Sequence, residues 1–257
     1  MSDMPTRISL VVPLFNEEKG IPLLAGRLAQ LREKLKPAYE LECLLVDDGS
    51  RDATVAVLQQ TFAGTPHVRI LEHGKNKGAG AAMRTGFQNA SGEIVCTIDA
   101  DCTFDPLEIP NLLEAMAREK ADIAIGSPYH PRGGVENVVP WRLFLSKGAS
   151  LMHRAVSRSK LYSYTSFLRA YRRDVLEKIS FESNGFVAVT ELLMKALLRG
   201  YTAVEVPTVL RRRVTGVSKM NVYRNIVSHL RLGSAVMYWR MTTAPSGKSA
   251  GSLSGSK

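Results

Sequence analysis

The first 126 residues alternate short apolar runs with longer stretches of helical periodicity. The runs are rich in β-branched residues and end in turn residues, which is typical of strands buried on both faces of a parallel sheet. They cover residues 8–12, 41–46, 68–71, 94–98 and 122–125. The helix-like stretches between them cover residues 17–36, 53–62, 78–89 and 107–120. This alternation predicts a doubly wound α/β fold with a mostly parallel, Rossmann-like sheet, whose ligands bind at the carboxyl ends of the strands.

The pattern changes after residue 126. A Gly/Pro-rich loop at 127–140 precedes helix-like segments near 141–158, 173–179 and 187–199 and a short strand at 203–206. Within 220–240, apolar residues recur at helical spacing: they are Tyr223, Ile226, Val227, Leu230 and Met237. This spacing predicts a C-terminal amphipathic helix. It would lie in a membrane interface, with Tyr238 and Trp239 at headgroup level, or pack on its own domain or on a second subunit. The Ser/Gly-rich stretch 241–257 predicts a disordered tail.

The charge is divided unevenly along the chain. Residues 1–131 hold 13 Lys or Arg and 18 Asp or Glu, whereas residues 132–257 hold 21 and 6. The halves therefore carry −5 and +15, which suggests a cation site in one and an anionic surface or ligand for the other. No aromatic-interleaved basic motif or finger spacing accompanies the basic half, so nucleic acid is not the predicted partner.

Targeting and redox features are few. No apolar run approaches the ~18–20 residues that span a bilayer, and the N-terminus lacks the apolar core of a signal peptide, so we expect a cytoplasmic protein. Cys43, Cys96 and Cys102 form no CxxC pair, which favours reduced, mostly buried thiols over a disulfide framework or zinc site. A Cys102 thiolate beside Asp101 is the minor alternative, and it would favour softer metals.

Acidic residues follow two of the predicted strands. Asp99 and Asp101, spaced i and i+2, can converge on one hard cation, so we predict a Mg²⁺ or Mn²⁺ site there. A solvated loop is the alternative. Asp47 and Asp48 precede a glycine at another strand end and can accept hydrogen bonds from a nucleobase or ribose, although a simple turn would also explain them.

The glycine-rich segment 74–86 reads GKNKGAGAAMRTG. It lacks both the third glycine of a dinucleotide fingerprint and the Gly-Lys-Ser/Thr of a P-loop, which excludes both classes of protein. We expect Gly78, Gly80 and Ala81 to let a helix pack close to the sheet beside the donor pocket.

Four segments in order resemble family 2 glycosyltransferases of the dolichol-phosphate mannosyltransferase or polyprenyl-phosphate glycosyltransferase branch. They are VVPLFNEE from Val11, VDDGSRDAT from Val46, KNKGAGAAMRTG from Lys75 and IDADCTFDP from Ile98. The resemblance implies a GT-A fold. It also implies that the base and ribose are held by Pro13, Phe15, Glu17 and Asp48, with Asp47 and Ala100 also in contact with the nucleotide sugar. Asp99 and Asp101 would face the metal and the diphosphate.

The resemblance continues to residue 219, with departures. GSPYHPRGG carries Pro128 where the branch has an arginine that contacts acceptor phosphate, whereas WRLFLS retains Arg142 and Ser146, which in such enzymes bind it. SFLRAYRRDVL, the Gly185-Phe186 pair with Glu191, and RRRVTGVSK also resemble the family. The last of these implies that Arg213 and Lys219 close over the diphosphates.

A second departure concerns the catalytic base. The family members that glycosylate a sugar hydroxyl carry a carboxylate just before the helix near Glu191, whereas this chain has Val189 and Thr190. A monoester phosphate is mostly ionised at neutral pH and needs no base. The departure therefore favours a phosphate acceptor.

These observations predict an inverting, metal-dependent transfer of a hexose from a GDP- or UDP-sugar to a polyprenyl phosphate. The enzyme would sit peripherally at the cytoplasmic membrane face, with a membrane subunit or second copy as further partners. The predicted parts are a glycosyltransferase domain at 1–219, divided at 126 into nucleotide-sugar and acceptor halves, an interfacial helix at 220–240 and the tail. A transferase acting on a soluble acceptor is the alternative. A degenerate transferase serving as a membrane-recruited partner is a weaker one, because both metal carboxylates are present.

Overall fold

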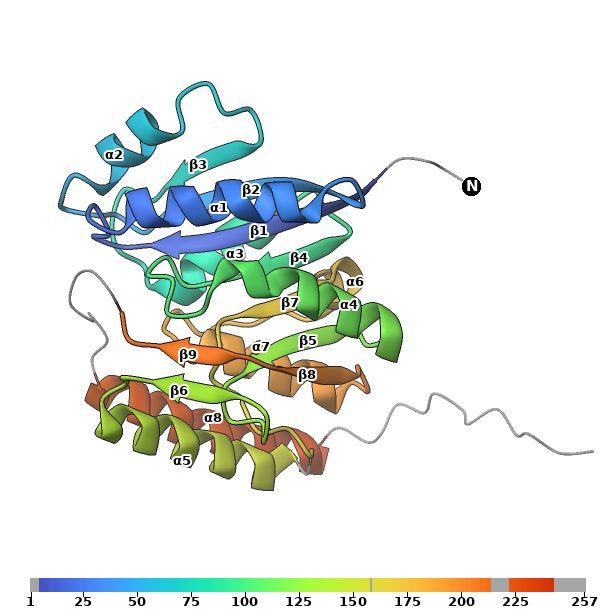
Figure 1. The fold of residues 1–257 in the computed structure, drawn as a ribbon. Coiled ribbons are helices and arrows are strands. Elements are labelled where there is room, and N and C mark those ends of the chain that lie inside the picture. The colour runs from blue at the N-terminus through green and yellow to red at the C-terminus, as the bar shows by residue number, and fades with distance from the viewer. Residues whose placement is uncertain (1–4, 158, 214–221, 243–257) are drawn as a thin grey trace, which may run out of the picture.

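The structure is a computed structural model that describes residues 5–157, 159–213 and 222–242. Its centre is a seven-stranded sheet in the order β3-β2-β1-β4-β7-β5-β8 (Figure 1). The strands are β1 (Thr6–Leu14), β2 (Tyr39–Asp47), β3 (Val68–Glu72), β4 (Ile94–Thr97), β5 (Ile123–Ser127), β7 (Arg169–Arg172) and β8 (Ala203–Pro207). All neighbours pair in parallel except β7, so the predicted α/β fold with a mostly parallel sheet is confirmed.

The strand β7 was not predicted. It has only four residues, begins and ends with arginine, and lies antiparallel between β4 and β5 in the middle of the sheet. Arg169 is fully buried there, and its guanidinium donates to backbone carbonyls instead of reaching solvent. A buried arginine satisfied by carbonyl groups breaks the apolar pattern from which strands are predicted.

Helices cover both faces of the sheet. The helices α1 (Ile21–Leu35) and α4 (Ile109–Glu119), preceded by the short 3₁₀ helix η1 (Pro106–Glu108), pack on the face that carries Leu10 of β1. The helix α3 (Ala79–Asn89) packs on the opposite face, which carries Val11. Successive residues of a strand point to opposite faces, so one apolar run builds both layers. The remaining helices of these layers are α2 (Thr54–Thr61), α6 (Arg173–Lys178) and α7 (Ala188–Leu198).

A smaller layer lies beyond β8. Two three-residue strands, β6 (Gly134–Glu136) and β9 (Val209–Arg211), pair in parallel as a separate sheet. The helices α5 (Pro140–Ser157) and α8 (Val222–Thr242) lie side by side below it (Figure 1). The small sheet was not predicted, because each of its strands is shorter than the window that periodicity needs.

The predicted C-terminal helix is present as α8, and the side chains that it buries are not those of the predicted apolar face. Its buried residues are His229, Leu232, Gly233 and Val236, which pack toward α5 and α7. The apolar residues of the predicted interfacial face are partly or largely exposed, including Tyr223, Leu230 and Met237. Trp239, expected at headgroup level, is half-buried, and the Lys195 ammonium lies 5.1 Å from its ring centroid. Among the described helices, none is long and apolar enough to cross a membrane.

Candidate active site

The acidic loops of the sequence meet at one edge of the sheet. The strand β1 pairs with β2 on one side and β4 on the other, and all three run in parallel. Their carboxyl ends therefore lie together, as the doubly wound pattern predicts. Asp47 is the last residue of β2, and the loops that follow the three strands carry Glu17, Asp48, Asp99 and Asp101.

The loops after β1 and β2 are joined by hydrogen bonds. The backbone N–H of Asn16 donates to Ser50 Oγ at 2.8 Å, and that of Glu17 donates to Thr54 Oγ1 at 2.7 Å. In return, the Arg51 N–H donates to Asn16 Oδ1 at 2.7 Å. Asn16 has φ of 52°, a conformation that asparagine tolerates better than most residues. Pro13 and Phe15, predicted nucleotide contacts, lie half-buried on either side of Leu14 in this loop region.

Asp48 is buried, and both of its oxygens are engaged inside the protein. Oδ1 lies 2.8 Å from His73 Nδ1 and accepts the Lys77 N–H at 2.9 Å, while Oδ2 accepts the Gly78 N–H at 2.7 Å. Asp48 thus orders the glycine-rich loop beside the site. His73 completes this network by contacting Thr85 Oγ1 at 2.9 Å.

Asp47 is equally buried but only partly engaged. Its Oδ2 accepts the Ser50 N–H at 2.9 Å, whereas Oδ1 is buried and has no hydrogen-bond partner among the described residues. Leaving a buried charged oxygen unpaired is costly, typically more than ~1–3 kcal/mol. The carboxylate is therefore suited to accept an N–H or O–H from a bound ligand.

Asp99 and Asp101 follow β4, and Arg213 lies opposite them. Arg213 Nη1 is 3.7 Å from Asp101 Oδ2, and Arg213 is also ion-paired with Glu17. The other Asp101 oxygen accepts the Thr103 N–H at 3.1 Å. Burial and the neighbouring Asp101 carboxylate raise the pKa of Asp99 well above its ordinary value, against the opposing effect of Arg213. Placing carboxylates so close is unfavourable unless a cation lies between them.

The acidic pair fits a hard divalent cation. Among the described residues there is no group of three or more His, Cys, Asp or Glu side chains that could hold a metal. Mg²⁺ and Mn²⁺ sites commonly use one or two carboxylates, with waters and substrate phosphates as further ligands, so two side chains suffice. In the absence of a metal, burial and the Asp101 charge raise the pKa of Cys102 to about 12. Ala100, between the two aspartates, has its side chain in the core, so only its backbone is available to a nucleotide.

The glycines of the 74–86 segment allow close contacts, but with a different partner from the one predicted. A Cβ at Gly78 would lie 2.2 Å from Asn184 O, and one at Gly80 would lie 2.2 Å from Ser183 O. These glycines therefore admit the loop before α7, and not the sheet. The close approach of α3 to the sheet is at Gly86, where a Cβ would meet Val11 Cγ1 at 2.2 Å.

The predicted acceptor residues are only partly described. Ser146 lies in α5, and its hydroxyl is 2.7 Å from Thr165 Oγ1. It lines a cavity of about 170 Å³ that also contacts Asp99 and Pro128. Arg142 lies one helical turn before Ser146, but its side chain is outside the described part of the structure. Lys219 also lies outside the described residues.

The position of the family's carboxylate base is closed to substrate. Val189 and Thr190 are buried in the first turn of α7. The Thr190 hydroxyl donates to the Tyr164 carbonyl at 2.9 Å, which turns it into the protein interior. Neither residue supplies a base.

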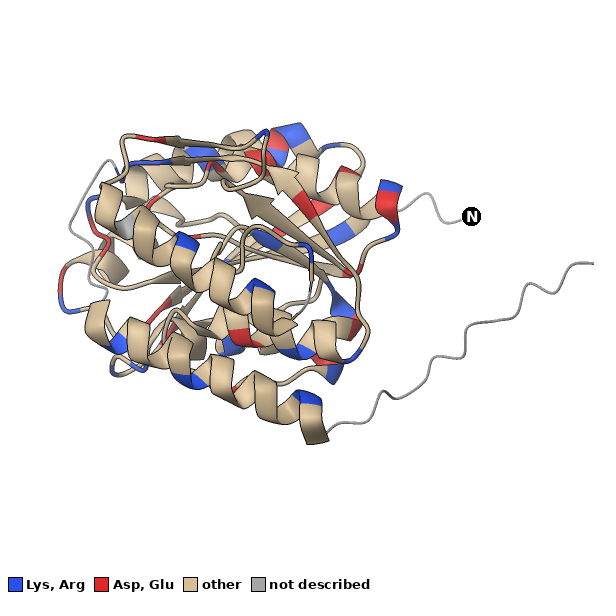
Figure 2. Cartoon of the chain, turned by 90° about the horizontal axis from the view of Figure 1, so that it is seen from below, with Lys and Arg blue, Asp and Glu red and all other residues tan. Residues whose placement is uncertain are grey.

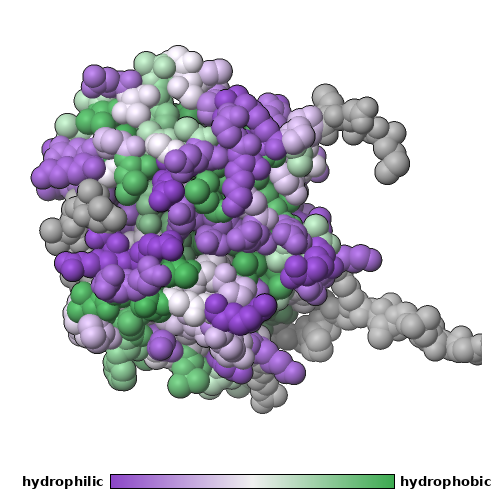
Figure 3. Space-filling model, in the orientation of Figure 1, coloured by the Kyte–Doolittle hydropathy of each residue, from purple (hydrophilic) through white to green (hydrophobic). Residues whose placement is uncertain are grey.

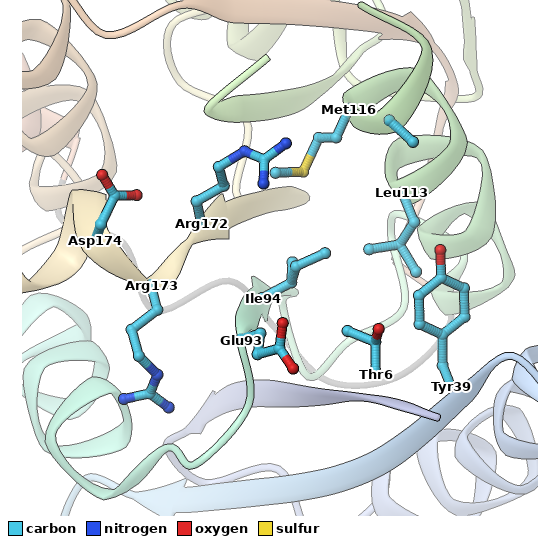
Figure 4. A pocket seen from close by; sticks show the side chains of 10 residues that line it. Thr6, Tyr39, Glu93, Ile94, Leu113, Met116, Arg172, Arg173 and Asp174 are labelled. Atoms are coloured by element: carbon cyan, nitrogen blue, oxygen red, sulfur yellow. The ribbon is translucent and has the colours of Figure 1, made fainter. Parts of the chain in front are cut away.

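A larger cavity of about 420 Å³ lies at the other end of the strands (Figure 4). It is lined by the first residues of β1 and β2, by Glu93 and Ile94 at the start of β4, and by Arg172 and Arg173. It is remote from the strand ends that carry the acidic residues, so it is not part of the candidate active site.

Comparisons with known proteins agree with this arrangement. Residues 9–180 match the model of the family described as Glycosyl transferase family 2. The chain is 36% identical over 226 residues to the polyprenol monophosphomannose synthase of Mycolicibacterium smegmatis, covering 84% of this chain and 82% of that protein. It is 33% identical over 236 residues to the dolichol-phosphate mannosyltransferase of Pyrococcus furiosus, covering 91% of this chain but only 64% of that longer protein.

Solved structures support the fold. Glucosyl-3-phosphoglycerate synthase from Mycobacterium tuberculosis, in complex with Mn²⁺, UDP and glucosyl-3-phosphoglycerate, matches with a TM-score of 0.65 and 20% identity, over 94% of this chain and 82% of that one. The same enzyme with Mn²⁺, UDP and phosphoglyceric acid matches with a TM-score of 0.66. These structures confirm the GT-A fold. The family match and the two mannosyltransferase relatives identify the chain as a glycosyltransferase of family 2, of the dolichol-phosphate mannosyltransferase type.

Proposed function

We propose that this chain transfers a mannosyl group from a GDP- or UDP-linked donor to the phosphate of a polyprenyl phosphate. The observation that carries the proposal is the acidic pair Asp99 and Asp101 at the end of β4, facing Arg213, in a chain that is 36% identical to a polyprenol monophosphomannose synthase. The names of the two relatives refer to polyprenol monophosphomannose and to dolichol phosphate, which favours a lipid phosphate acceptor over a soluble one.

The donor would bind along the carboxyl ends of β1, β2 and β4. Asp47 offers one unpartnered carboxylate oxygen to an N–H of the base or an O–H of the ribose. Pro13, Phe15 and Glu17 would lie along the nucleotide on the β1 side. Asp48 would act through the loop that it orders, since its oxygens already accept hydrogen bonds from residues 77 and 78.

The transfer would be a single displacement with inversion. An oxygen of the acceptor phosphate attacks the anomeric carbon, the bond from that carbon to the diphosphate breaks, and the nucleoside diphosphate leaves with the electron pair. A Mg²⁺ or Mn²⁺ ion held by Asp99 and Asp101 would supply charge neutralisation for the leaving group. Arg213 and Lys219 would add positive charge on the same side. The attacking oxygen needs no base, which agrees with the buried Val189 and Thr190.

The acceptor phosphate would reach the site along α5. Ser146 lies beside the cavity that contacts Asp99, and Arg142 precedes it by one turn. Pro128 stands buried in the wall of the same cavity, so it supplies no charge there. The charge for the acceptor would therefore come from α5.

The lower surface of the molecule suits a membrane. The exposed apolar side chains of α5 and α8 include Phe144, Leu151, Tyr223, Met237 and Met241, and hydrophobic surface is visible at the lower end of the molecule (Figure 3). Each helix carries three Lys or Arg and no Asp or Glu. Figure 2 shows the molecule from this lower side, with Lys and Arg in blue. Apolar side chains inserted between acyl chains and basic ones beside anionic headgroups would place the acceptor site at the interface.

The test is transfer by the full chain, with Mn²⁺ or Mg²⁺, from labelled GDP-mannose or UDP-sugars to a polyprenyl phosphate in detergent. Soluble sugars and soluble phosphate esters serve as competing acceptors. We expect labelled product to partition into the organic phase only with the lipid phosphate. Asp101→Asn should lower the rate by at least about 100-fold, because metal-assisted charge stabilisation supplies several kcal/mol.

Asp105→Asn is the matched control. Asp105 is in the same loop but caps η1, where its side chain accepts the Leu107 N–H, and asparagine can replace it in that role. Its transfer rate should stay within about threefold of wild type. Wild-type activity in the Asp101→Asn enzyme would exclude the metal assignment, and transfer only to soluble acceptors would exclude the lipid phosphate.

A further inference from the structure

The cavity beside Asp99 is lined by many residues that carry a hydroxyl group. Six of its residues carry one: they are Thr103, Tyr129, Ser146, Ser163, Thr165 and Ser166. Among the described side chains that line it, none belongs to Lys, Arg or His. Its volume of about 170 Å³ is small beside the ~300–1,000 Å³ typical of pockets for drug-sized ligands. The described part of its wall therefore suits a small ligand that carries hydroxyl groups.

Two of these hydroxyls are unusual. Ser163 and Ser166 are 1% and 4% exposed, and the Oγ of each has no hydrogen-bond partner among the described residues. Buried hydroxyls are normally paired, because an unpaired one loses its hydrogen bonds to water. By contrast, the neighbouring Thr165 hydroxyl is paired with Ser146. Ser163 and Ser166 thus retain hydrogen-bonding capacity at the wall of the cavity.

The loop that carries them, residues 163–167, is held in place by hydrogen bonds to side chains. Arg169, fully buried, donates from Nε to the Ser166 carbonyl at 2.8 Å and from Nη2 to the Tyr164 carbonyl at 2.5 Å. Glu205 accepts the Ser163 N–H at 2.8 Å, and Thr97 Oγ1 donates to the Phe167 carbonyl at 2.6 Å. Four backbone polar groups of this loop are therefore hydrogen-bonded to side chains of other elements or of β7. Such a loop is pre-organised, so little ordering is needed when a ligand binds.

The chemistry favours a sugar ring over a phosphate. A phosphate group is best bound by Arg or Lys, and the part of the wall formed by Ser163 and Ser166 offers only hydroxyl groups. The acceptor phosphate would instead lie on the α5 side of the cavity, near Ser146. A sugar ring presents hydroxyls to serine and apolar C–H faces to aromatic rings such as Tyr129 and Phe167, which also line the cavity. The position next to Asp99 is where the hexosyl group of a metal-bound donor would lie.

We propose that Ser163 and Ser166 hydrogen-bond to hydroxyls of the hexose on the nucleotide donor and so select which sugar is transferred. This inference rests on the proposed function, because it takes the ligand to be a nucleotide sugar. A site built to pair a substrate hydroxyl discriminates strongly against analogues that lack it, since its buried groups are then left unpaired.

The experiment compares two ligands that differ only by the sugar. Dissociation constants are measured by calorimetry with Mn²⁺ for GDP and GDP-mannose, and for UDP and UDP-glucose, with the full chain. In Ser163→Ala and Ser166→Ala we expect the nucleotide sugar to bind about three- to tenfold more weakly, and in the double variant at least about tenfold more weakly. Binding of the nucleoside diphosphate should not change.

Ser127→Ala is the matched control, because the Ser127 hydroxyl is also buried and without a described partner but does not line the cavity. It should leave both affinities unchanged. Ser163→Ala and Ser166→Ala remove hydroxyls that make no hydrogen bond to the described residues, so the thermal midpoints of these variants should stay near that of wild type.

The possible results distinguish failure of the proposed function from failure of sugar recognition by Ser163 and Ser166. If wild-type protein binds neither nucleoside diphosphates nor nucleotide sugars, the proposed function fails. If it binds and transfers but the double variant binds the nucleotide sugar as tightly as wild type, only the sugar-recognition role is overturned. If the variants bound the nucleoside diphosphate and the nucleotide sugar with equally reduced affinity, the two serines would have a structural role and would not recognise the sugar. An unchanged donor affinity with a raised KM for polyprenyl phosphate would assign the hydroxyls to the acceptor instead.

Discussion

Glu17, in the loop after β1, is ion-paired with Arg213, just beyond β9, although 196 positions separate them in the chain. Arg213 also reaches Asp101, at 3.7 Å. One guanidinium thus links the loop of the first strand with the acidic pair of the fourth. In the metal-free protein it offsets the repulsion among carboxylates that would otherwise raise the free energy of the folded state.

Because Arg213 and a divalent cation both favour Asp101, they should compete. We expect Arg213→Ala to bind Mn²⁺ about five- to tenfold more tightly in the absence of nucleotide, since a competing charge pair of about 1 kcal/mol is removed. Sugar transfer should nevertheless fall by at least about tenfold, because a positive charge near the leaving diphosphate is lost. Titration calorimetry with Mn²⁺ and the transfer assay measure the two effects.

Arg211→Ala provides the comparison for that variant. Arg211 lies two residues earlier and pairs with Glu136 at 3.3 Å, on the exposed small sheet. Its removal should leave Mn²⁺ affinity unchanged. Weaker Mn²⁺ binding in Arg213→Ala would contradict competition and indicate that Arg213 orders the metal ligands.

Gly49 should be much less tolerant of a side chain than Gly64. Both have positive φ, 71° and 67°, but a Cβ at Gly49 would lie 2.4 Å from the Lys75 carbonyl carbon, whereas one at Gly64 meets nothing within 4 Å. Gly64→Ala should therefore cost about 1 kcal/mol for backbone strain alone. Gly49→Ala adds a clash between two site loops and should cost more than about 3 kcal/mol. Urea unfolding followed by circular dichroism measures both, and equal losses would argue against the close approach of the loops.

The sequence predicted the parts of the fold that follow from regular patterns. The strands β1 and β2 contain apolar runs because both of their faces are buried. Such runs can be recognised from the local sequence without knowledge of tertiary contacts. The acidic residues that follow β1, β2 and β4 then had to meet, because parallel neighbouring strands end at the same edge. For the same reason the location of the candidate site was predictable.

Features that depend on tertiary contacts could not be predicted from the sequence. The strand β7 is built around a buried arginine, and no local pattern distinguishes Arg169 from a solvent-exposed one. The sequence predicted the same ligand contacts for Asp47 and Asp48. In the structure, Asp48 is hydrogen-bonded to His73, whereas one oxygen of Asp47 has no partner among the described residues. Which of two adjacent carboxylates faces a ligand depends on loops distant in the chain.

A buried histidine pair should make the protein sensitive to acid. His153 of α5 and His229 of α8 are joined by a hydrogen bond of 3.1 Å between Nε2 and Nδ1. Burial lowers the pKa of each from its ordinary 6.5 to about 4. Between pH 6.5 and 4 the unfolded chain therefore binds more protons than the folded one, so the free energy of unfolding falls as the pH falls through this window. Each histidine contributes on the order of 3 kcal/mol to this loss.

The measurement is the free energy of urea unfolding at a series of pH values. His229→Gln should reduce the loss of stability across the window, because one titrating group is removed from the pair. His130→Gln, in a half-buried surface loop where the ring contacts Tyr162, serves as the control and should keep the wild-type slope. A His229→Gln profile parallel to that of wild type would show that other groups cause the acid sensitivity.

The exposed apolar side chains of α5 should determine affinity for membranes. Phe144 and Leu151 are 77% and 69% exposed, so replacing both with serine leaves the core untouched. Burying a large apolar side chain contributes about 1.5–3 kcal/mol, so the double variant should bind vesicles containing phosphatidylglycerol at least about tenfold more weakly in a sedimentation assay. Raising the salt concentration should weaken binding of both proteins, because the basic residues of α5 and α8 act through screened charge. Leu23→Ser, which changes a 36% exposed leucine on α1, should sediment like wild type. If the double variant also did so, α5 would not be the membrane-facing helix, and the acceptor would have to reach Ser146 by another route.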